Sequence, residues 1–144
     1  MASAPVSTYQ GVVYPWHCDH MGHMNVTWYA AKFDEATWSL FASFGITASY
    51  VREHGCGMAA VEQHTVYEKE LRPGEVVFVL TRVLEARPRT LRFVHELMRA
   101  DGGIRAATST ITGVHLDLTT RRAQAFPAPI LTRIERMMTS ATDG

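Results

Sequence analysis

The sequence predicts a single α+β domain in which one long helix packs against an antiparallel sheet. Three observations support this fold class. The chain has 144 residues, 47% of them hydrophobic, which is enough for one core of ordinary size. One segment shows helical periodicity, and five segments have the alternation or the β-branched and aromatic content of strands. Turn signals between the later strands favour antiparallel pairing. We therefore expect residues 1–144 to form one domain.

The first expected element is a strand over Tyr9 to Trp16 (YQGVVYPW), after a frayed start at residues 1–7. Its aromatic and β-branched residues are typical of strands, and Pro15 limits it to a sheet edge or to the strand's end. The segment from His17 to Asn25 follows. Its content of His, Asp, Gly and Asn indicates a loop with special backbone demands.

The next element is a long helix from about Val26 to Phe44. Asn25 or Thr27 can cap its N-terminus, and Gly45 can end it. An apolar stripe at helical spacing predicts the face that packs on the sheet. That stripe consists of Tyr29, Phe33, Ala36, Leu40, Phe41 and Phe44.

A short helical turn and loop over residues 46–57 leads into four long strands. These are expected at Met58–Leu71, Glu75–Glu85, Thr90–Ala100 and Ile104–Leu118. The turn signals between them are Arg72-Pro73-Gly74, Arg87-Pro88-Arg89 and Asp101-Gly102-Gly103. We expect the four strands to pair in chain order as a meander, with Val76 to Leu84 placed centrally because it is apolar on both faces. A short helix from Ile130 to Met138 should follow Pro127 and Pro129.

Charge and composition exclude several classes of protein. Fourteen Lys and Arg balance fourteen Asp and Glu, whereas a nucleic-acid-binding module usually carries a basic excess. The sequence contains no stretch near the roughly 18 apolar residues that span a membrane. Its N-terminus lacks the basic and apolar regions of a secretory signal, and two cysteines do not make a disulfide framework. We expect a cytoplasmic protein with no nucleic-acid or membrane partner.

The chemistry is expected in the loop that precedes the long helix. Unpaired backbone N–H groups and the helix dipole at a helix start favour an anion or a developing oxyanion. The carboxylate of Asp19 could attack a carbonyl carbon or activate water beside that helix end. Gly22 would allow the backbone to turn closely between the two.

The pattern Asp19-x-x-Gly22-His23-x-Asn25-x-x-x-Tyr29, followed by Phe33, resembles the signature of hotdog-fold acyl-CoA thioesterases of the 4-hydroxybenzoyl-CoA thioesterase type. The element order is also similar to that fold, in which four strands wrap one long central helix after a first strand. The resemblance covers the chain from about Tyr9 to Ile130. It implies hydrolysis of an acyl-CoA thioester to a free acid and CoA, with CoA as part of the substrate and no metal or redox cofactor.

The resemblance also implies roles for individual residues. Asp19 takes the position of the family's catalytic carboxylate, which acts as nucleophile or as general base toward water. The backbone N–H of Val26 falls where the family polarises the thioester carbonyl. His23, Asn25 and Tyr29 match positions that shape the loop and line the site. Many members carry a second Asn where this chain has Val26, and a backbone donor survives that change.

Two other interpretations of this region stay open. Trp16 and Trp28 flank the motif, so they could shape an aromatic pocket for an aryl acyl group or, through cation–π contact, for a quaternary ammonium acyl group. A metal cluster would need the ligand spacing of a helix, whereas this stretch is expected to be a loop. Its ligands would be His17, His20 and His23.

Alternative functions and the assembly complete the expectations. Glu35 on the helix is the second candidate for the catalytic carboxylate, as in a different branch of these thioesterases. An acyl-thioester hydratase or dehydratase of the same fold is one alternative function, and a non-catalytic acyl-CoA-binding subunit is another. One long helix cannot cover five strands and their edges, so we expect a homodimer or homotetramer.

Overall fold

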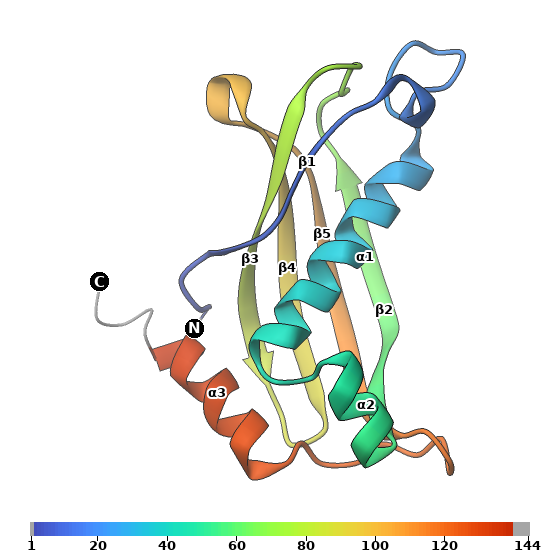
Figure 1. Ribbon diagram of the computed structural model, residues 1–144. Coiled ribbons are helices and arrows are strands. Elements are labelled where there is room, and N and C mark those ends of the chain that lie inside the picture. The colour runs from blue at the N-terminus through green and yellow to red at the C-terminus, as the bar shows by residue number, and fades with distance from the viewer. Residues whose placement is uncertain (1, 140–144) are drawn as a thin grey trace.

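The computed structural model describes residues 2–139. Helix α1 lies across one face of a five-stranded antiparallel sheet with the order β1-β3-β4-β5-β2 (Figure 1). The strands are β1 (Val6–Val12), β2 (Cys56–Tyr67), β3 (Val76–Ala86), β4 (Thr90–Arg99) and β5 (Ile104–Asp117). The helices are α1 (Val26–Ser43), α2 (Ala48–His54) and α3 (Ala128–Thr139), with 3₁₀ turns η1 (Pro15–His17) and η2 (Asp101–Gly103). The predicted fold class is confirmed. The expected C-terminal helix is α3, and the expected helical turn after the long helix is the short helix α2. No helix within residues 2–139 is long and apolar enough to cross a membrane.

The expected four-stranded meander is wrong at its first strand. β3, β4 and β5 pair in chain order, but β2 pairs with β5 at the far edge of the sheet and not with β3. Residues 68–75 carry the chain from that edge to the other side, where the Gly74 N–H donates to the Val13 carbonyl at 2.7 Å. The turn at Arg72-Pro73-Gly74 therefore starts a strand beside β1. Residues 68–75 are called the β2–β3 crossover below.

Element bounds differ from the expectation mainly around the loop and the crossover. β1 lies at Val6–Val12, and Pro15–His17 forms a 3₁₀ turn instead of extending the strand. β2 ends at Tyr67 rather than at Leu71. The chain leaves the sheet there because Leu71 is fully buried and its carbonyl accepts the Met24 N–H at 2.7 Å. The crossover is therefore packed against the loop that the sequence singles out.

Helix α1 forms where its periodicity predicts. The side-chain oxygen of Asn25 accepts the Thr27 N–H at 2.9 Å, so Asn25 is the N-cap. Gly45 follows the helix with φ of +97°, a left-handed conformation suited to glycine. The predicted apolar stripe is buried, and Phe33, Ala36, Leu40 and Phe44 are fully covered. Each large side chain in it stabilises the fold by about 1.5–3 kcal/mol.

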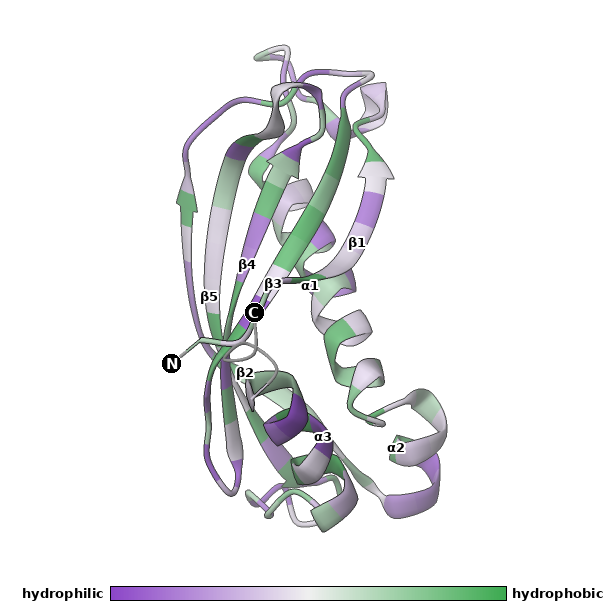
Figure 2. Ribbon diagram, turned by 90° about the vertical axis from the view of Figure 1, so that its left-hand side faces the viewer, coloured by the Kyte–Doolittle hydropathy of each residue, from purple (hydrophilic) through white to green (hydrophobic). Residues whose placement is uncertain are grey.

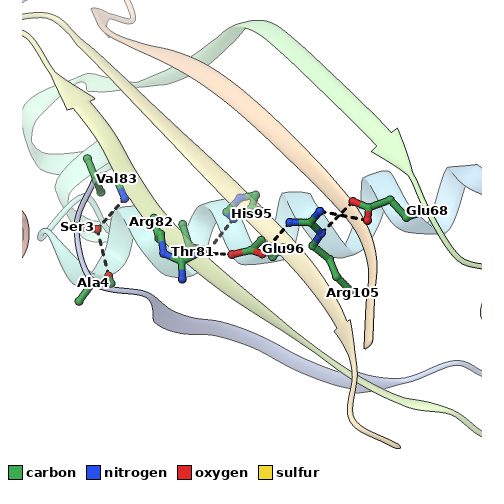
Figure 3. Close-up of polar contacts among 9 residues, drawn as sticks. All are labelled: Ser3, Ala4, Glu68, Thr81, Arg82, Val83, His95, Glu96 and Arg105. Carbon is green, nitrogen blue, oxygen red and sulfur yellow. Dashed lines mark hydrogen bonds and ion pairs between the residues drawn. The ribbon is translucent and has the colours of Figure 1, made fainter. Parts of the chain in front are cut away.

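The two faces of the sheet differ in chemistry. On the α1 side β3 buries Val77, Val79 and Val83, and the strand is green along most of its length in Figure 2. The opposite face carries a chain of ion pairs that runs across the strands (Figure 3). Its members are Arg82, Glu96, Arg105 and Glu68. The helix side of the sheet is therefore where apolar ligand surface can lie.

A polar cluster around His95 lies within the mostly apolar interior. His95 of β4 is fully buried, and its ring nitrogens lie 2.6 Å from the Thr81 hydroxyl and 2.8 Å from the Thr37 hydroxyl. Thr81 in turn lies 2.8 Å from the hydroxyl of Thr8. These four residues join α1, β4, β3 and β1.

Candidate active site

A tight turn of backbone forms the loop before α1. Cys18 and Met24 form a bridge that closes the loop, and the Asp19 N–H donates to the His23 carbonyl at 3.2 Å. The Gly22 N–H donates back to the Asp19 carbonyl at 3.0 Å, and Gly22 has φ of +86°. Open space surrounds the position where a Cβ would stand, so the need for glycine comes from its φ alone. The loop lies beside the start of α1 (Figure 1), and Asp19 in this loop bonds to the N-cap residue Asn25.

Two hydrogen bonds hold the carboxylate of Asp19. Oδ1 accepts the Met21 N–H at 2.8 Å, and Oδ2 accepts the side-chain amide of Asn25 at 2.8 Å. Both bonds favour the charged form, so they lower the pKa of Asp19 below its ordinary value, the bond from Asn25 contributing most. The result is an ionised, oriented and partly exposed carboxylate.

Asn25 links this carboxylate to the helix. Its Oδ1 accepts the Thr27 N–H, which turns Nδ2 toward Asp19. Its own backbone N–H donates to the His17 carbonyl at 2.9 Å. The same side chain therefore starts α1 and positions the carboxylate.

Val26 is the first residue of α1, and its side chain is 55% exposed. Its backbone N–H precedes the first intrahelical hydrogen bond, so that bond does not use it. A hollow of about 190 Å³ lies at this helix end, between α1 and the β2–β3 crossover. This helix-start hollow is lined by His23, Met24, Val26, Tyr29, Tyr67, Glu68, Lys69 and Glu70.

Tyr29 forms a wall of the helix-start hollow. Its hydroxyl donates to the Lys69 carbonyl at 3.0 Å, and its ring meets Tyr67 edge-on at 5.1 Å. Burial, with the nearby Glu70 carboxylate, raises the pKa of Tyr29 to about 12. The phenol therefore stays protonated. On the same side, Nε2 of His23 lies 3.5 Å from the Glu70 carboxylate.

The structure places Trp16 differently from the other candidates. Its ring is 66% exposed and stacks on Tyr14 with centroids 4.5 Å apart. Trp28 instead contacts the ring of His17 at 4.5 Å, and Nδ1 of His17 accepts the Tyr14 N–H. These rings form an aromatic cluster on the outside of the loop, and neither tryptophan is among the residues that line the helix-start hollow.

Sequence reasoning missed one wall of the site. Glu68, Lys69 and Glu70 belong to the crossover, and nothing local in the sequence shows that it folds back onto residues 23–29. The expected strand continues to Leu71, so it places these three residues in the sheet and not beside the loop. Glu35, the second candidate for the carboxylate, is exposed on α1 and is not a lining residue of the helix-start hollow.

A five-stranded antiparallel sheet packed against one long central helix is the hotdog fold. A family model described as the Thioesterase-like superfamily matches residues 13–134, and the chain belongs to that family. The resemblance expected from the motif is thereby confirmed.

Two curated relatives are similar along the chain. A betainyl-CoA thioesterase of Pseudomonas aeruginosa is 27% identical over 135 residues, which cover 94% of this chain and 85% of the relative. An L-carnitine dehydrogenase/betainyl-CoA thioesterase of Agrobacterium fabrum is 27% identical over 136 residues. The match covers 94% of this chain but only 28% of that longer protein.

Solved structures show the same fold. A hypothetical protein of Staphylococcus aureus, solved in complex with CoA, superposes with a TM-score of 0.89 at 24% identity, covering 96% of this chain and 87% of that one. A DHNA-CoA thioesterase of Staphylococcus aureus superposes with a TM-score of 0.83 at 16% identity, covering 94% and 93% of the two chains.

Proposed function

We propose that the protein hydrolyses acyl-CoA thioesters, with Asp19 as nucleophile or general base and the backbone N–H of Val26 as oxyanion donor. The observation that carries the proposal is the double role of Asn25, which orients the Asp19 carboxylate and caps the helix that presents Val26. Family membership and the names of the two curated relatives support the substrate class.

The proposed reaction needs only these groups and water. As general base, Asp19 takes a proton from water while the water oxygen attacks the thioester carbonyl carbon. The carbonyl oxygen gains the negative charge, and the Val26 N–H at the positive end of α1 stabilises it. Collapse of the intermediate breaks the C–S bond, and the proton returns to the CoA thiolate. As nucleophile, the Asp19 carboxylate attacks the carbonyl carbon, the C–S bond breaks and the CoA thiolate leaves. Water then hydrolyses the resulting acyl anhydride, which releases the free acid, regenerates the Asp19 carboxylate and supplies the proton that the thiolate takes up. Neither route uses a metal or a redox cofactor.

We further propose a homodimer or homotetramer. β2 is an edge strand of the sheet, and it exposes three large apolar side chains among polar ones. Val61 is 64% exposed, Val66 44% and Tyr67 49%. An edge strand with unpaired backbone groups and exposed apolar side chains favours pairing with a second chain.

The first test is release of free thiol from a panel of acyl-CoAs, including betainyl-, benzoyl- and medium-chain acyl-CoA. Asp19→Asn and Asp19→Ala should lower kcat by at least about 10²-fold, the size expected for loss of a general base or nucleophile. Asp101→Asn, an exposed aspartate on η2, is the matched control and should keep wild-type turnover.

Urea unfolding checks that the Asp19 variants remain folded, and a parallel assay after treatment with a chelator checks that no metal is required. Near-normal turnover in folded Asp19→Asn would remove Asp19 from the mechanism. Conversion of an enoyl thioester without thiol release would instead support a hydratase, and binding without turnover a non-catalytic subunit.

A further inference from the structure

A second groove, separate from the helix-start hollow, lies further along α1. Its walls are α1 from Ala30 to Phe41 and β2 from Met58 to Gln63, with Ile111 of β5 between them. It consists of a cavity of about 260 Å³ and a smaller one of about 60 Å³. Asp34 and Thr37 are among the residues that line both. In the order of the chain, the first lining residue of this α1–β2 groove is Ala30, and the last α1 residue of the helix-start hollow is Tyr29.

The lining of the α1–β2 groove is mostly apolar. Phe33 is fully buried, Phe41 is 4% exposed, and the Trp38 ring stands edge-on to Phe41 at 5.6 Å with 47% of its surface exposed. Thr37 offers little to a ligand, because its hydroxyl donates to the Phe33 carbonyl and contacts His95. A ligand in the groove would therefore meet aromatic and aliphatic surface almost throughout.

Asp34 is the only ionisable side chain among the residues that line the groove. Within residues 2–139 it takes part in none of the ion pairs or side-chain hydrogen bonds of the structure. It is exposed, so water now solvates it. A neutral ligand that closed over it would remove that water without replacing it, whereas a cation would compensate the charge.

The neighbouring ring adds to this preference. An indole face attracts a cation by its quadrupole, most strongly of the aromatic side chains. A primary ammonium brings three N–H donors, and apart from Asp34 the groove offers only the Gln63 side chain as a polar group not already bonded. A trialkylammonium brings none, so it needs only the carboxylate and the ring.

Resting on the function proposed above, we infer that the α1–β2 groove receives the distal end of the acyl group. Asp34 and Trp38 select an acyl group that ends in a quaternary ammonium. Asp34 lies about two helical turns beyond Val26, roughly 12 Å along the axis. A longer ω-ammonium acyl chain therefore reaches Asp34 from the helix start, and the two-carbon betainyl group does not.

The test uses pairs of acyl-CoAs that differ only in charge. Betainyl-, 4-(trimethylammonio)butyryl- and 6-(trimethylammonio)hexanoyl-CoA are each compared with the neutral analogue in which carbon replaces nitrogen. The ratio of kcat/KM within a pair should rise with chain length to about tenfold or more in favour of the cation. In Asp34→Asn this ratio should fall toward one, because the cation loses its partner and the neutral analogue no longer covers a carboxylate.

Two further variants sharpen the result. Trp38→Leu should lose part of the preference and Trp38→Phe less of it, since phenylalanine keeps an aromatic face. Glu53→Gln, an exposed carboxylate on α2 outside the groove, should keep the wild-type ratio. Calorimetric binding of 6-(trimethylammonio)hexanoate to wild type and Asp34→Asn tests the groove without turnover, with an expected loss of about tenfold in affinity.

The two proposals fail in different ways. Equal kcat/KM within every pair in the wild type would overturn the charge selection while leaving the thioesterase intact. A drop in Asp34→Asn that is the same for charged and neutral substrates would overturn it as well, since that marks a structural or interface role. Absence of thiol release from every substrate would refute the proposed function. The calorimetric measurement would still show whether the groove binds a quaternary ammonium group through Asp34.

Discussion

At the scale of single residues, Asn25 carries two separable tasks. Its oxygen caps α1 and its nitrogen holds Asp19. Asn25→Ser keeps a good cap but cannot donate to the carboxylate in the same way, whereas Asn25→Ala loses both functions. Comparison of the two variants therefore separates helix stability from orientation of the carboxylate.

Both variants should raise the pKa of Asp19, because the hydrogen bond from Asn25 is the largest influence that lowers it. The reaction uses the ionised carboxylate, so the acid limb of the pH–rate profile should move to higher pH in both. Only Asn25→Ala should also lose about 1 kcal/mol of unfolding free energy, measured with urea. An unshifted acid limb in Asn25→Ser would contradict the assignment of Asn25 as the orienting group.

Much of the residue-scale site is visible in the sequence. Asp19, Gly22 and Asn25 lie close along the chain, so their loop and cap roles follow from local rules. The positions of Glu70 and Tyr67 do not follow from local rules, because these residues reach the helix start only through the pairing of β2 with β5. Periodicity assigns a residue to a face of a strand but not to a neighbour in space.

At the scale of elements, His95 holds α1 against the sheet. The Thr37 hydroxyl donates to the Phe33 carbonyl, so it accepts from Nε2–H, and Nδ1 accepts from Thr81. The ring is therefore neutral. Protonation would place a donor where Thr81 donates now, in a fully buried site, and burial lowers the pKa of His95 to about 3.

This depressed pKa predicts acid sensitivity of the fold. Below the unfolded-state value of 6.5 the unfolded chain binds a proton that the folded chain excludes. Stability is therefore fully present above about pH 6.5 and falls by up to about 1.4 kcal/mol per pH unit down to about pH 3. Urea midpoints at pH 7, 5 and 4 measure this slope. His95→Gln should be less stable than the wild type at pH 7, but its unfolding free energy should fall less steeply as the pH decreases. An equal slope in wild type and variant would exclude His95 as its source.

The elements themselves could be predicted where local signals are strong. The stripe on α1 and the hairpins of β3, β4 and β5 are found nearly as expected. The position of β2 in the sheet could not be predicted. A strand that leads into a turn signal looks in the sequence like the first strand of a hairpin. β2 pairs instead with β5, a contact between segments far apart in the chain, and the buried Leu71 packs the crossover away from the sheet.

At the scale of the whole molecule, the exposed edge of β2 predicts self-association. Val61→Lys places a charge on the most exposed apolar position of that strand, and lysine on an edge opposes pairing with another strand. We expect the wild type to sediment as a dimer or tetramer and the variant to shift toward the monomer at micromolar concentration. Thr119→Lys, on an exposed turn, is the control for added charge.

Analytical ultracentrifugation measures the mass of each species. A monomeric wild type would contradict the proposed assembly, and an unchanged oligomer in Val61→Lys would place its interface away from this edge. Thiol-release assays on the same samples show whether turnover depends on the assembled form.

The hydrogen bond from Met24 to Leu71 sets an order on synthesis of the protein. The ribosome makes the Asp19 loop early, but the carbonyl that pins it belongs to a segment made much later. Likewise, the Tyr29 hydroxyl cannot form its hydrogen bond until Lys69 has been synthesised. A nascent chain that ends before the β2–β3 crossover can begin α1 and yet cannot complete the wall beside it. The candidate site is therefore complete only when the strands on both sides of the crossover have been made, and a shorter nascent chain lacks one of its walls.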